Sequence, residues 1–216
     1  PRSTLSSSSA ASDVYKRQAY MSDIIGVDEA GRGPWAGPVV AAAVILDFSK
    51  AGELSEIDDS KKIPEKKREI LYGKVIETCR AYAVCEASAQ VIDRINILEA
   101  TLDCMKNAVE KLVKSGFGAG IALVDGISCP RAEGIKIETV KDGDARSLSI
   151  AAASIIAKVH RDRLMRRYDV LFPQYGFLKH KGYGTKKHIL ALRKYGPCEL
   201  HRKSYKPIAE ILNEKK

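Results

Sequence analysis

The feature that most constrains the fold is an apolar run at residues 24–27 that ends in two adjacent carboxylates, Asp28 and Glu29. The run predicts a buried strand over residues 24–28. A carboxylate at the end of such a strand is costly unless a cation or hydrogen-bond donors meet it. The motif Gly31-Arg32-Gly33 follows; its glycines allow close backbone approach to a ligand, and its guanidinium binds phosphate. Together these residues favour a metal site facing a phosphodiester over a solvated acidic turn.

Positive charge is concentrated in the last third of the chain. The 216 residues suit one domain with a substantial core, and their formal net charge is +9. Residues 141–216 hold 18 Lys and Arg against 7 Asp and Glu, whereas residues 1–140 hold 18 against 20. A basic module beside an acidic core suits a nuclease, because the basic part attracts the nucleic-acid backbone. On charge alone, a basic surface with no such role remains an equal alternative.

The cysteines, the apolar stretches and the N-terminal segment argue against a zinc-cluster, disulfide-rich, membrane-spanning or secreted protein. The five cysteines are scattered without a C-x-x-C pair, which argues against a zinc cluster or a disulfide framework and favours the cytoplasm. The longest apolar stretch, 39–46, is too short to span a bilayer. Residues 1–20 are polar and serine-rich and lack the apolar segment of a secretory signal. We expect them to be a non-native or disordered leader, with the native chain beginning at Met21.

Hydrophobic periodicity predicts strands interspersed with helices. Apolar runs and alternation indicate the strands, while i, i+3, i+4 spacing and capping residues indicate the helices. This order is typical of an α/β fold. The predicted strands are 24–28, 39–46, 80–88, 121–125 and 135–140, and the predicted helices are 64–78, 97–114, 147–172, 185–195 and 206–212.

Two further acids are placed to join the first pair. Asp125 ends the predicted strand 121–125, and Asp144 precedes the long helix. If the strands ending in Asp28 and Asp125 are neighbours, these two side chains converge. Hard oxygen ligands of this kind select Mg²⁺ or Mn²⁺. Taken singly, Asp125 as a turn residue and Asp144 as an aid to the helix start are equally good interpretations; Asp142 we expect to be a solvated bystander.

Eight segments between about residue 24 and residue 208 form an ordered set of motifs. They are residues 24–44, Asp59-Ser60-Lys61-Lys62, Asn96-Ile97-Leu98, Val124-Asp125-Gly126, Gly143-Asp144, residues 149–158, His180-Lys181-Gly182-Tyr183 and His201-Arg202-Lys203-Ser204. In sequence and in order, these segments resemble bacterial ribonuclease HII, the type 2 ribonuclease H. Two residues depart mildly from the pattern: Trp35 stands where a smaller apolar residue is common, and Tyr205 where phenylalanine is frequent. Both keep an apolar body and affect local packing rather than activity.

The resemblance implies a fold and a set of site residues. The fold would be a ribonuclease H-like mixed sheet flanked by helices over residues 21–172, with a small basic, helical, substrate-binding module over residues 173–216. The catalytic and metal-binding residues implied for a site with two Mg²⁺ or Mn²⁺ ions are Asp28, Glu29, Asp125 and Asp144. The substrate-binding residues implied are Gly31, Arg32, Gly33, Lys61 and Tyr183. Without the resemblance, Lys61 could equally be a solvated lysine before a helix, and Tyr183 would be interpreted as a tyrosine that packs on the surface.

The resemblance also implies an activity. The chain would be an endoribonuclease that cuts RNA in RNA–DNA hybrids and single ribonucleotides embedded in duplex DNA, on their 5′ side, leaving 3′-hydroxyl and 5′-phosphate ends. Its partners would be those duplexes, with no membrane involved; we expect a monomer. Two alternatives remain open: a DNA nuclease of the same fold, and a non-catalytic module that binds RNA–DNA hybrids.

Arginines and histidines outside the acidic set are also assigned roles. On the long helix, a group of arginines is predicted to track the nucleic-acid backbone, with an ordinary charged helix face as the alternative. His180 is predicted to be a hydrogen-bonded structural histidine, with a general acid as the alternative, and His201 is predicted to anchor the C-terminal module. The arginines are Arg161, Arg163, Arg166 and Arg167.

Overall fold

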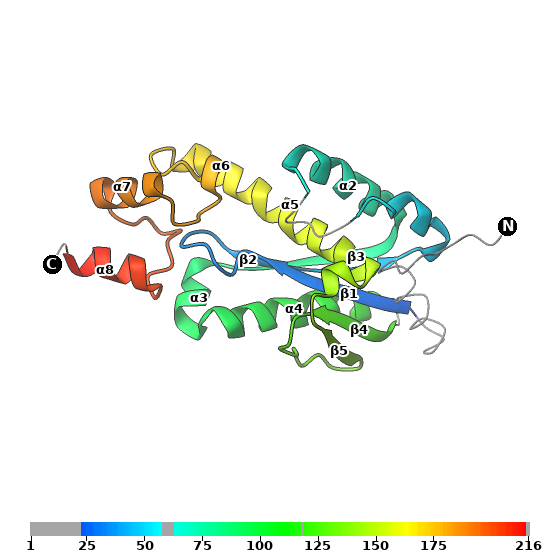
Figure 1. Ribbon diagram of the computed structural model, residues 1–216. Helices are drawn as coiled ribbons and strands as arrows, with labels where there is room; N and C mark the ends of the chain where they lie inside the picture. The colour runs from blue at the N-terminus through cyan, green and yellow to red at the C-terminus, as the bar shows by residue number, and fades with distance from the viewer. Residues whose placement is uncertain (1–22, 58–62, 118, 215–216) are drawn as a thin grey trace.

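A five-stranded mixed sheet lies at the centre of the molecule (Figure 1). The computed structural model describes residues 23–57, 63–117 and 119–214, so the predicted leader 1–20 and Lys61 lie outside the described residues. The strand order is β3-β2-β1-β4-β5; β1 pairs antiparallel with β2 and parallel with β4. The strands are β1 (Asp23–Ala30), β2 (Val39–Leu46), β3 (Cys79–Ala87), β4 (Ala119–Asp125) and β5 (Lys136–Val140).

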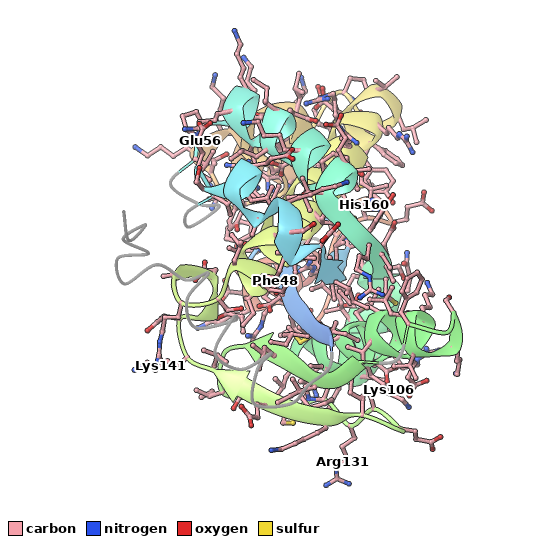
Figure 2. The ribbon with its side chains drawn as sticks, turned by 90° about the vertical axis from the view of Figure 1, so that its right-hand side faces the viewer. Phe48, Glu56, Lys106, Arg131, Lys141 and His160 are labelled. Carbon is pink, nitrogen blue, oxygen red and sulfur yellow. The ribbon has the colours of Figure 1, made fainter. Side chains whose placement is uncertain are left out.

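Helices cover both faces of this sheet. On one face α5 (Leu148–Leu171) packs on β1 and β2, with α2 (Glu65–Thr78) and the 3₁₀ helix η1 (Phe48–Leu54) beyond it. On the other face lie α3 (Ala89–Ile95) and α4 (Ile97–Lys114). Figure 2 shows the helical layers on opposite sides of the sheet, with Glu56 near α2 in the upper part and Lys106 of α4 at the lower right. The sheet therefore has an apolar core on each side.

The central strands have the sequence that two covered faces require. Every residue of β2 is buried, in keeping with its unbroken apolar run. In β1, Ile25 and Val27 belong to the core under α4, whereas Ile24 faces α5. Because side chains alternate along a strand, Asp28 falls on the α5 side.

The backbone of helix α5 packs directly against the backbone of β1. A Cβ on Gly26 would lie 2.0 Å from the backbone carbon of Ser149, so only glycine fits there. The helix begins where the hydroxyl of its N-cap, Ser147, accepts a hydrogen bond from the amide of Ile150. This contact fixes the start of α5 against the strand that carries Asp28.

The C-terminal segment packs against one end of α5 and against the loop after β1. It contains α6 (Phe177–His180), α7 (Lys186–Tyr195) and α8 (Lys206–Glu214), at the left of Figure 1. Phe177 and Leu192 form an apolar cluster with Met165 of α5. His201 forms an isolated antiparallel bridge with Ala36. The predicted boundary between the catalytic domain, residues 21–172, and the C-terminal module, residues 173–216, coincides with the C-cap of α5, Phe172. This division into two parts stays a prediction.

Most predicted elements are confirmed, and four short helices were missed. The bounds of β2 and α4 agree with the sequence prediction residue for residue, and Ser147 and Phe172 cap α5. Helix α3 was not predicted; it has 7 residues, too few for a clear 3.6-residue period, and is joined to α4 by Asn96 at φ 67°. The 3₁₀ helices η1 and η2 (Gly143–Ala145) and the four-residue helix α6 were also missed. Among the described helices, none combines the length and apolar character needed to cross a bilayer.

Candidate active site

The parallel pairing of β1 and β4 brings Asp28 and Asp125 to the same end of the sheet. Val27 is the register partner of Val124, so the two aspartates follow paired residues. Ile121 and Leu123 of β4 pack with Ile24 on the α5 side, and by alternation Asp125 faces that side too. The predicted convergence of these two carboxylates therefore agrees with the sheet register.

Asp28 is buried and held by donors. Its side chain is 4% exposed, and its Oδ1 accepts a hydrogen bond of 2.7 Å from the amide of Glu29. Burial raises the pKa of Asp28 well above its usual range, and the charges of Glu29 and Asp125 raise it further. Hydrogen bonds from the Glu29 amide and from Ser154 act in the opposite direction. The carboxyl is thus a group that a bound cation would stabilise in its charged form.

Glu29 is the second acid of the site. Burial raises its pKa, the guanidinium of Arg32 lowers it, and the charge of Asp125 raises it. The Glu29 Oε1 to Arg32 Nη1 distance is 3.5 Å. The side chains of Glu29 and Arg32 therefore lie together at the same end of the sheet as Asp28.

The turn before α5 is tied to Asp125. The amide of Gly143 donates a hydrogen bond of 2.6 Å to Asp125 Oδ1. A Cβ on Gly143 would lie 2.6 Å from Ile150 Cδ1 and 3.1 Å from Asp125 Oδ1, so glycine permits the approach. Asp144 comes next in the 3₁₀ helix η2 (Gly143–Ala145) and is 9% exposed. This link brings the chain of Asp144 to the end of β4.

A cavity of about 270 Å³ is lined by three of the four acids, Asp28, Glu29 and Asp125, and by the Gly31–Gly33 turn. In the described chain its wall does not include Asp144, and no group of three or more His, Cys, Asp and Glu side chains is arranged as metal ligands. The four-acid metal site therefore stays a prediction, although an all-carboxylate donor set fits Mg²⁺ or Mn²⁺. The lining residues are Asp28, Glu29, Ala30, Gly31, Arg32, Gly33, Asp125, Ser154, Lys158, Arg161 and Tyr183.

The predicted substrate-binding residues within the described chain lie at this cavity. Gly31 has φ 101°, and a Cβ there would meet Arg161 Nε at 2.1 Å. A Cβ on Gly33 would lie 3.6 Å from Tyr183 Cε1, so the tyrosine ring stands beside this residue. Tyr183 is 49% exposed and available to a ligand. These segments are 150 residues apart in sequence and meet only through the fold.

Helix α5 supplies two lining residues that the sequence did not single out. Ser154 and Lys158 lie one turn apart on the face toward the cavity. Lys158 Nζ donates to Asp162 Oδ1 at 2.7 Å, and Arg68 Nη1 donates to Asp162 Oδ2 at 3.2 Å. The i, i+4 spacing of Ser154 and Lys158 in the predicted helix was a signal that could have placed them together.

The prediction for the α5 arginines is wrong for Arg161. Its side chain is fully buried, and its guanidinium donates to the carbonyls of Pro38, Lys181 and Ala36. A buried guanidinium is stable where backbone acceptors satisfy its donors, so this residue has a structural role. The partners of the others also lie within the protein: Arg163 contacts Glu69 at 2.6 Å and Arg166 contacts Glu65 at 3.1 Å, while exposed Arg167 lies close enough to Glu86 to lower its pKa.

The histidine predictions agree with the hydrogen bonds. His180 Nε2 donates to the Tyr175 carbonyl at 2.8 Å while its Nδ1 accepts from the Gly182 amide. His201 is buried and contacts His188 Nε2 at 3.0 Å. His188, which the sequence analysis missed, lies 3.0 Å from the carbonyl of Tyr183. Histidines thus connect the C-terminal segment with the cavity.

Comparison with known proteins identifies the family. The model of the family described as Ribonuclease HII matches residues 25–208. The chain is 49% identical over 191 residues to Ribonuclease HII of Francisella tularensis subsp. tularensis (strain WY96-3418), covering 88% of this chain and 99% of that protein. It is 54% identical over 194 residues to Ribonuclease HII of Geotalea daltonii, covering 89% and 86%.

Solved structures share the fold. The ribonuclease H2 from Pyrococcus horikoshii OT3 superposes with a TM-score of 0.72 at 24% identity, over 89% of this chain and 98% of that one. RNase HII in the PCNA complex from Archaeoglobus fulgidus gives 0.72 at 26% identity, over 87% and 96%. Bst-RNase HIII in complex with Mn²⁺ gives 0.74 at 18% identity, over 100% and 74%. The fold is therefore ribonuclease H-like, and the chain belongs to the ribonuclease HII family and is a ribonuclease H enzyme.

Proposed function

We propose that this enzyme cuts the RNA strand of RNA–DNA hybrids and also single ribonucleotides embedded in duplex DNA, on their 5′ side, leaving 3′-hydroxyl and 5′-phosphate ends. Ribonuclease H activity on RNA–DNA hybrids follows from membership of the family. The observation that carries the finer proposal is the shared cavity. It places Asp28, Glu29 and Asp125 beside the Gly31–Gly33 turn and Tyr183, so groups suited to hold cations stand next to groups suited to read a ribose.

The acids would hold Mg²⁺ or Mn²⁺ in a two-ion site, with Asp28 and Asp125 as shared ligands and Glu29 and Asp144 completing it. Bound ions of this kind lower the pKa of an attacking water and stabilise the leaving oxygen. The protein's part is to hold the ligands ready: the Glu29 amide orients Asp28 and the Gly143 amide orients Asp125. The Mn²⁺ complex of Bst-RNase HIII, a protein of the same fold, supports this choice of metal.

The substrate would be recognised by its phosphates and by its 2′-hydroxyl. Arg32 and Lys158 line the cavity as cations suited to a phosphodiester. The half-exposed ring of Tyr183 beside Gly33 is suited to stack on a sugar or base at the junction between RNA and DNA. Lys61 is proposed as a further phosphate contact on the resemblance alone.

The C-terminal segment would bind the duplex beyond the cleavage point. Its basic residues supply much of the charge surplus of residues 141–216, and charge of this kind gives sequence-independent affinity. We also propose that the enzyme acts in the cytoplasm as a monomer, with hybrid and ribonucleotide-containing duplexes as its partners.

The test uses three duplexes of one sequence: one with a single ribonucleotide, its all-DNA twin and a full RNA–DNA hybrid. With Mg²⁺ or Mn²⁺, we expect cleavage of the first and third, and product ends mapped to the 5′ side of the ribonucleotide. Asp28→Asn and Asp125→Asn should abolish cleavage and leave the circular dichroism spectrum unchanged.

Asp142→Asn is the matched control. Asp142 is exposed and adopts the left-handed conformation at φ 53°, which asparagine tolerates well, so this variant should cleave normally. Cutting of the all-DNA twin would indicate a DNA nuclease instead. Binding without cutting of any duplex would indicate a hybrid-binding module.

A further inference from the structure

Arg202 lies behind the Gly31–Gly33 turn, on the side away from solvent. Its side chain is fully buried, and its amide donates to the Trp35 carbonyl at 2.9 Å. On the following residues, the carboxylate of Asp93 accepts from the amides of Lys203 and Ser204 at 2.9 and 2.8 Å. The backbone on both sides of Arg202 is therefore fixed, once to the loop after β1 and once to α3.

Four of the five hydrogen bonds that this guanidinium donates end on carbonyls of the loop after β1. Nε donates to the Gly37 carbonyl at 3.1 Å, and Nη2 donates to the carbonyls of Gly31 at 2.6 Å and Gly37 at 2.9 Å. Nη1 donates to the Arg32 carbonyl at 2.8 Å and to the hydroxyl of Tyr205 at 2.9 Å. These contacts use the five N–H groups that an arginine has.

The hydroxyl of Tyr205 completes the arrangement. It accepts from Arg202 and donates to the Arg32 carbonyl at 2.6 Å. Phenylalanine at this position would remove this hydrogen bond and leave the Arg32 carbonyl with the one from Arg202. The hydroxyl of Tyr205 thus affects the turn directly, beyond the local packing expected from the sequence.

The direction of these carbonyls determines the direction of the neighbouring amides. The described chain contains no cis peptide bond, and in a trans peptide the carbonyl of one residue and the N–H of the next point in opposite directions. Because the carbonyls of Gly31 and Arg32 point to Arg202, the N–H groups of Arg32 and Gly33 point away from it. Both residues are exposed and line the cavity that holds Asp28.

We propose that Arg202, assisted by Tyr205, is a positioning residue for ribonucleotide recognition: it holds two carbonyls inward so that two successive amides face the substrate. Successive outward N–H groups form a pocket for an electronegative atom, and the 2′-oxygen of a ribose is the atom that distinguishes RNA from DNA. The inference rests on the proposed function, because it concerns how the same site selects its substrate.

The test compares wild type with Tyr205→Phe and Arg202→Lys. Fluorescence anisotropy with a chelator present measures the Kd for the single-ribonucleotide duplex and for its all-DNA twin, so that both duplexes stay intact. Kinetics with Mn²⁺ then separate KM from kcat. Tyr195→Phe, which removes the hydroxyl of a half-exposed tyrosine on α7, is the matched control.

We expect Tyr205→Phe to reduce the preference for the ribonucleotide duplex about fivefold, the effect of one hydrogen bond, chiefly through a higher KM. Arg202→Lys should remove the preference, and Tyr195→Phe should keep it. Two results with folded Tyr205→Phe would overturn the inference: equally weakened binding of both duplexes, or an unchanged preference for the ribonucleotide duplex. Either result counts even if Arg202→Lys fails to fold. Wild type that prefers the ribonucleotide duplex but cleaves nothing would refute the proposed function while leaving this inference intact.

Discussion

Acid should destabilise the protein through two buried histidines, His188 and His201. The His188 ring nitrogen Nδ1 faces the Tyr183 carbonyl at 3.0 Å and must donate to it, so Nε2 of His188 accepts from Nε2–H of His201. Nδ1 of His201 in turn accepts from the Cys198 amide at 2.9 Å. Each ring therefore has its hydrogen bonds satisfied in the neutral form, and an added proton would set two N–H groups against each other.

The size of the effect follows from the pKa values. Burial lowers the pKa of His188 from 6.5 to about 4, and burial with the neighbouring His188 lowers that of His201 to about 4. Between these values the unfolded chain binds more protons than the folded one, so stability falls as the pH falls from 6.5 to 4. Linkage gives a loss of about 2 kcal/mol per histidine at pH 5 relative to pH 7.

Urea unfolding at pH 7, 6 and 5 measures this loss. Glutamine at position 201 keeps a donor for His188 and an acceptor for the Cys198 amide but does not titrate, so His201→Gln should lose about half as much stability as wild type. Ile127→Gln, at an exposed residue that carries no titratable group, is the control and should lose as much as wild type. A free energy of unfolding that is equal at pH 7 and pH 5 would refute the reasoning.

Three other perturbations have expected outcomes. Gly26→Ala should lower the melting temperature, at a cost of about 3 kcal/mol, because its Cβ would meet the Ser149 backbone; a calorimetric change below about 0.5 kcal/mol would contradict the close approach of α5 to β1. Arg161→Met should destabilise by about 3 kcal/mol, since the carbonyls of Ala36, Pro38 and Lys181 lose their donor; unchanged urea midpoints would disagree with a structural role. Removal of divalent metal with a chelator should stop cleavage and added Mn²⁺ should restore it, measured on the single-ribonucleotide duplex; turnover that persists in the chelator would exclude a metal-dependent reaction.

Local patterns were enough to predict most elements and the pairing of two acids. The unbroken apolar run of β2 and the stripe of α4 each carry their period within a short window, and Ser147 caps α5. Asp28 and Asp125 were predicted to meet because each ends an apolar strand, and the register of β1 and β4 agrees. Asp144 was placed by resemblance, and its share in a metal site stays a prediction.

The burial of Arg161 and Arg202 could not be predicted from sequence. Arginine is ordinarily exposed, and the backbone carbonyls that make these two exceptional belong to residues between 20 and 171 positions away along the chain. Their partners are almost all backbone carbonyls, which every residue possesses, so no side-chain pattern marks them. Ser154 and Lys158 have a helical spacing, but only the packing of α5 on β1 shows which face they occupy.

The amino-acid sequence by itself determined the strands and the longer helices, the acids at strand ends and the family, because these depend on neighbours within a few residues or on motifs in order. The tertiary structure alone decided which side chains share the cavity, which arginines are buried and which way the amides of Arg32 and Gly33 point. Those properties depend on contacts between segments that meet only when the C-terminal part of the chain packs against the loop after β1.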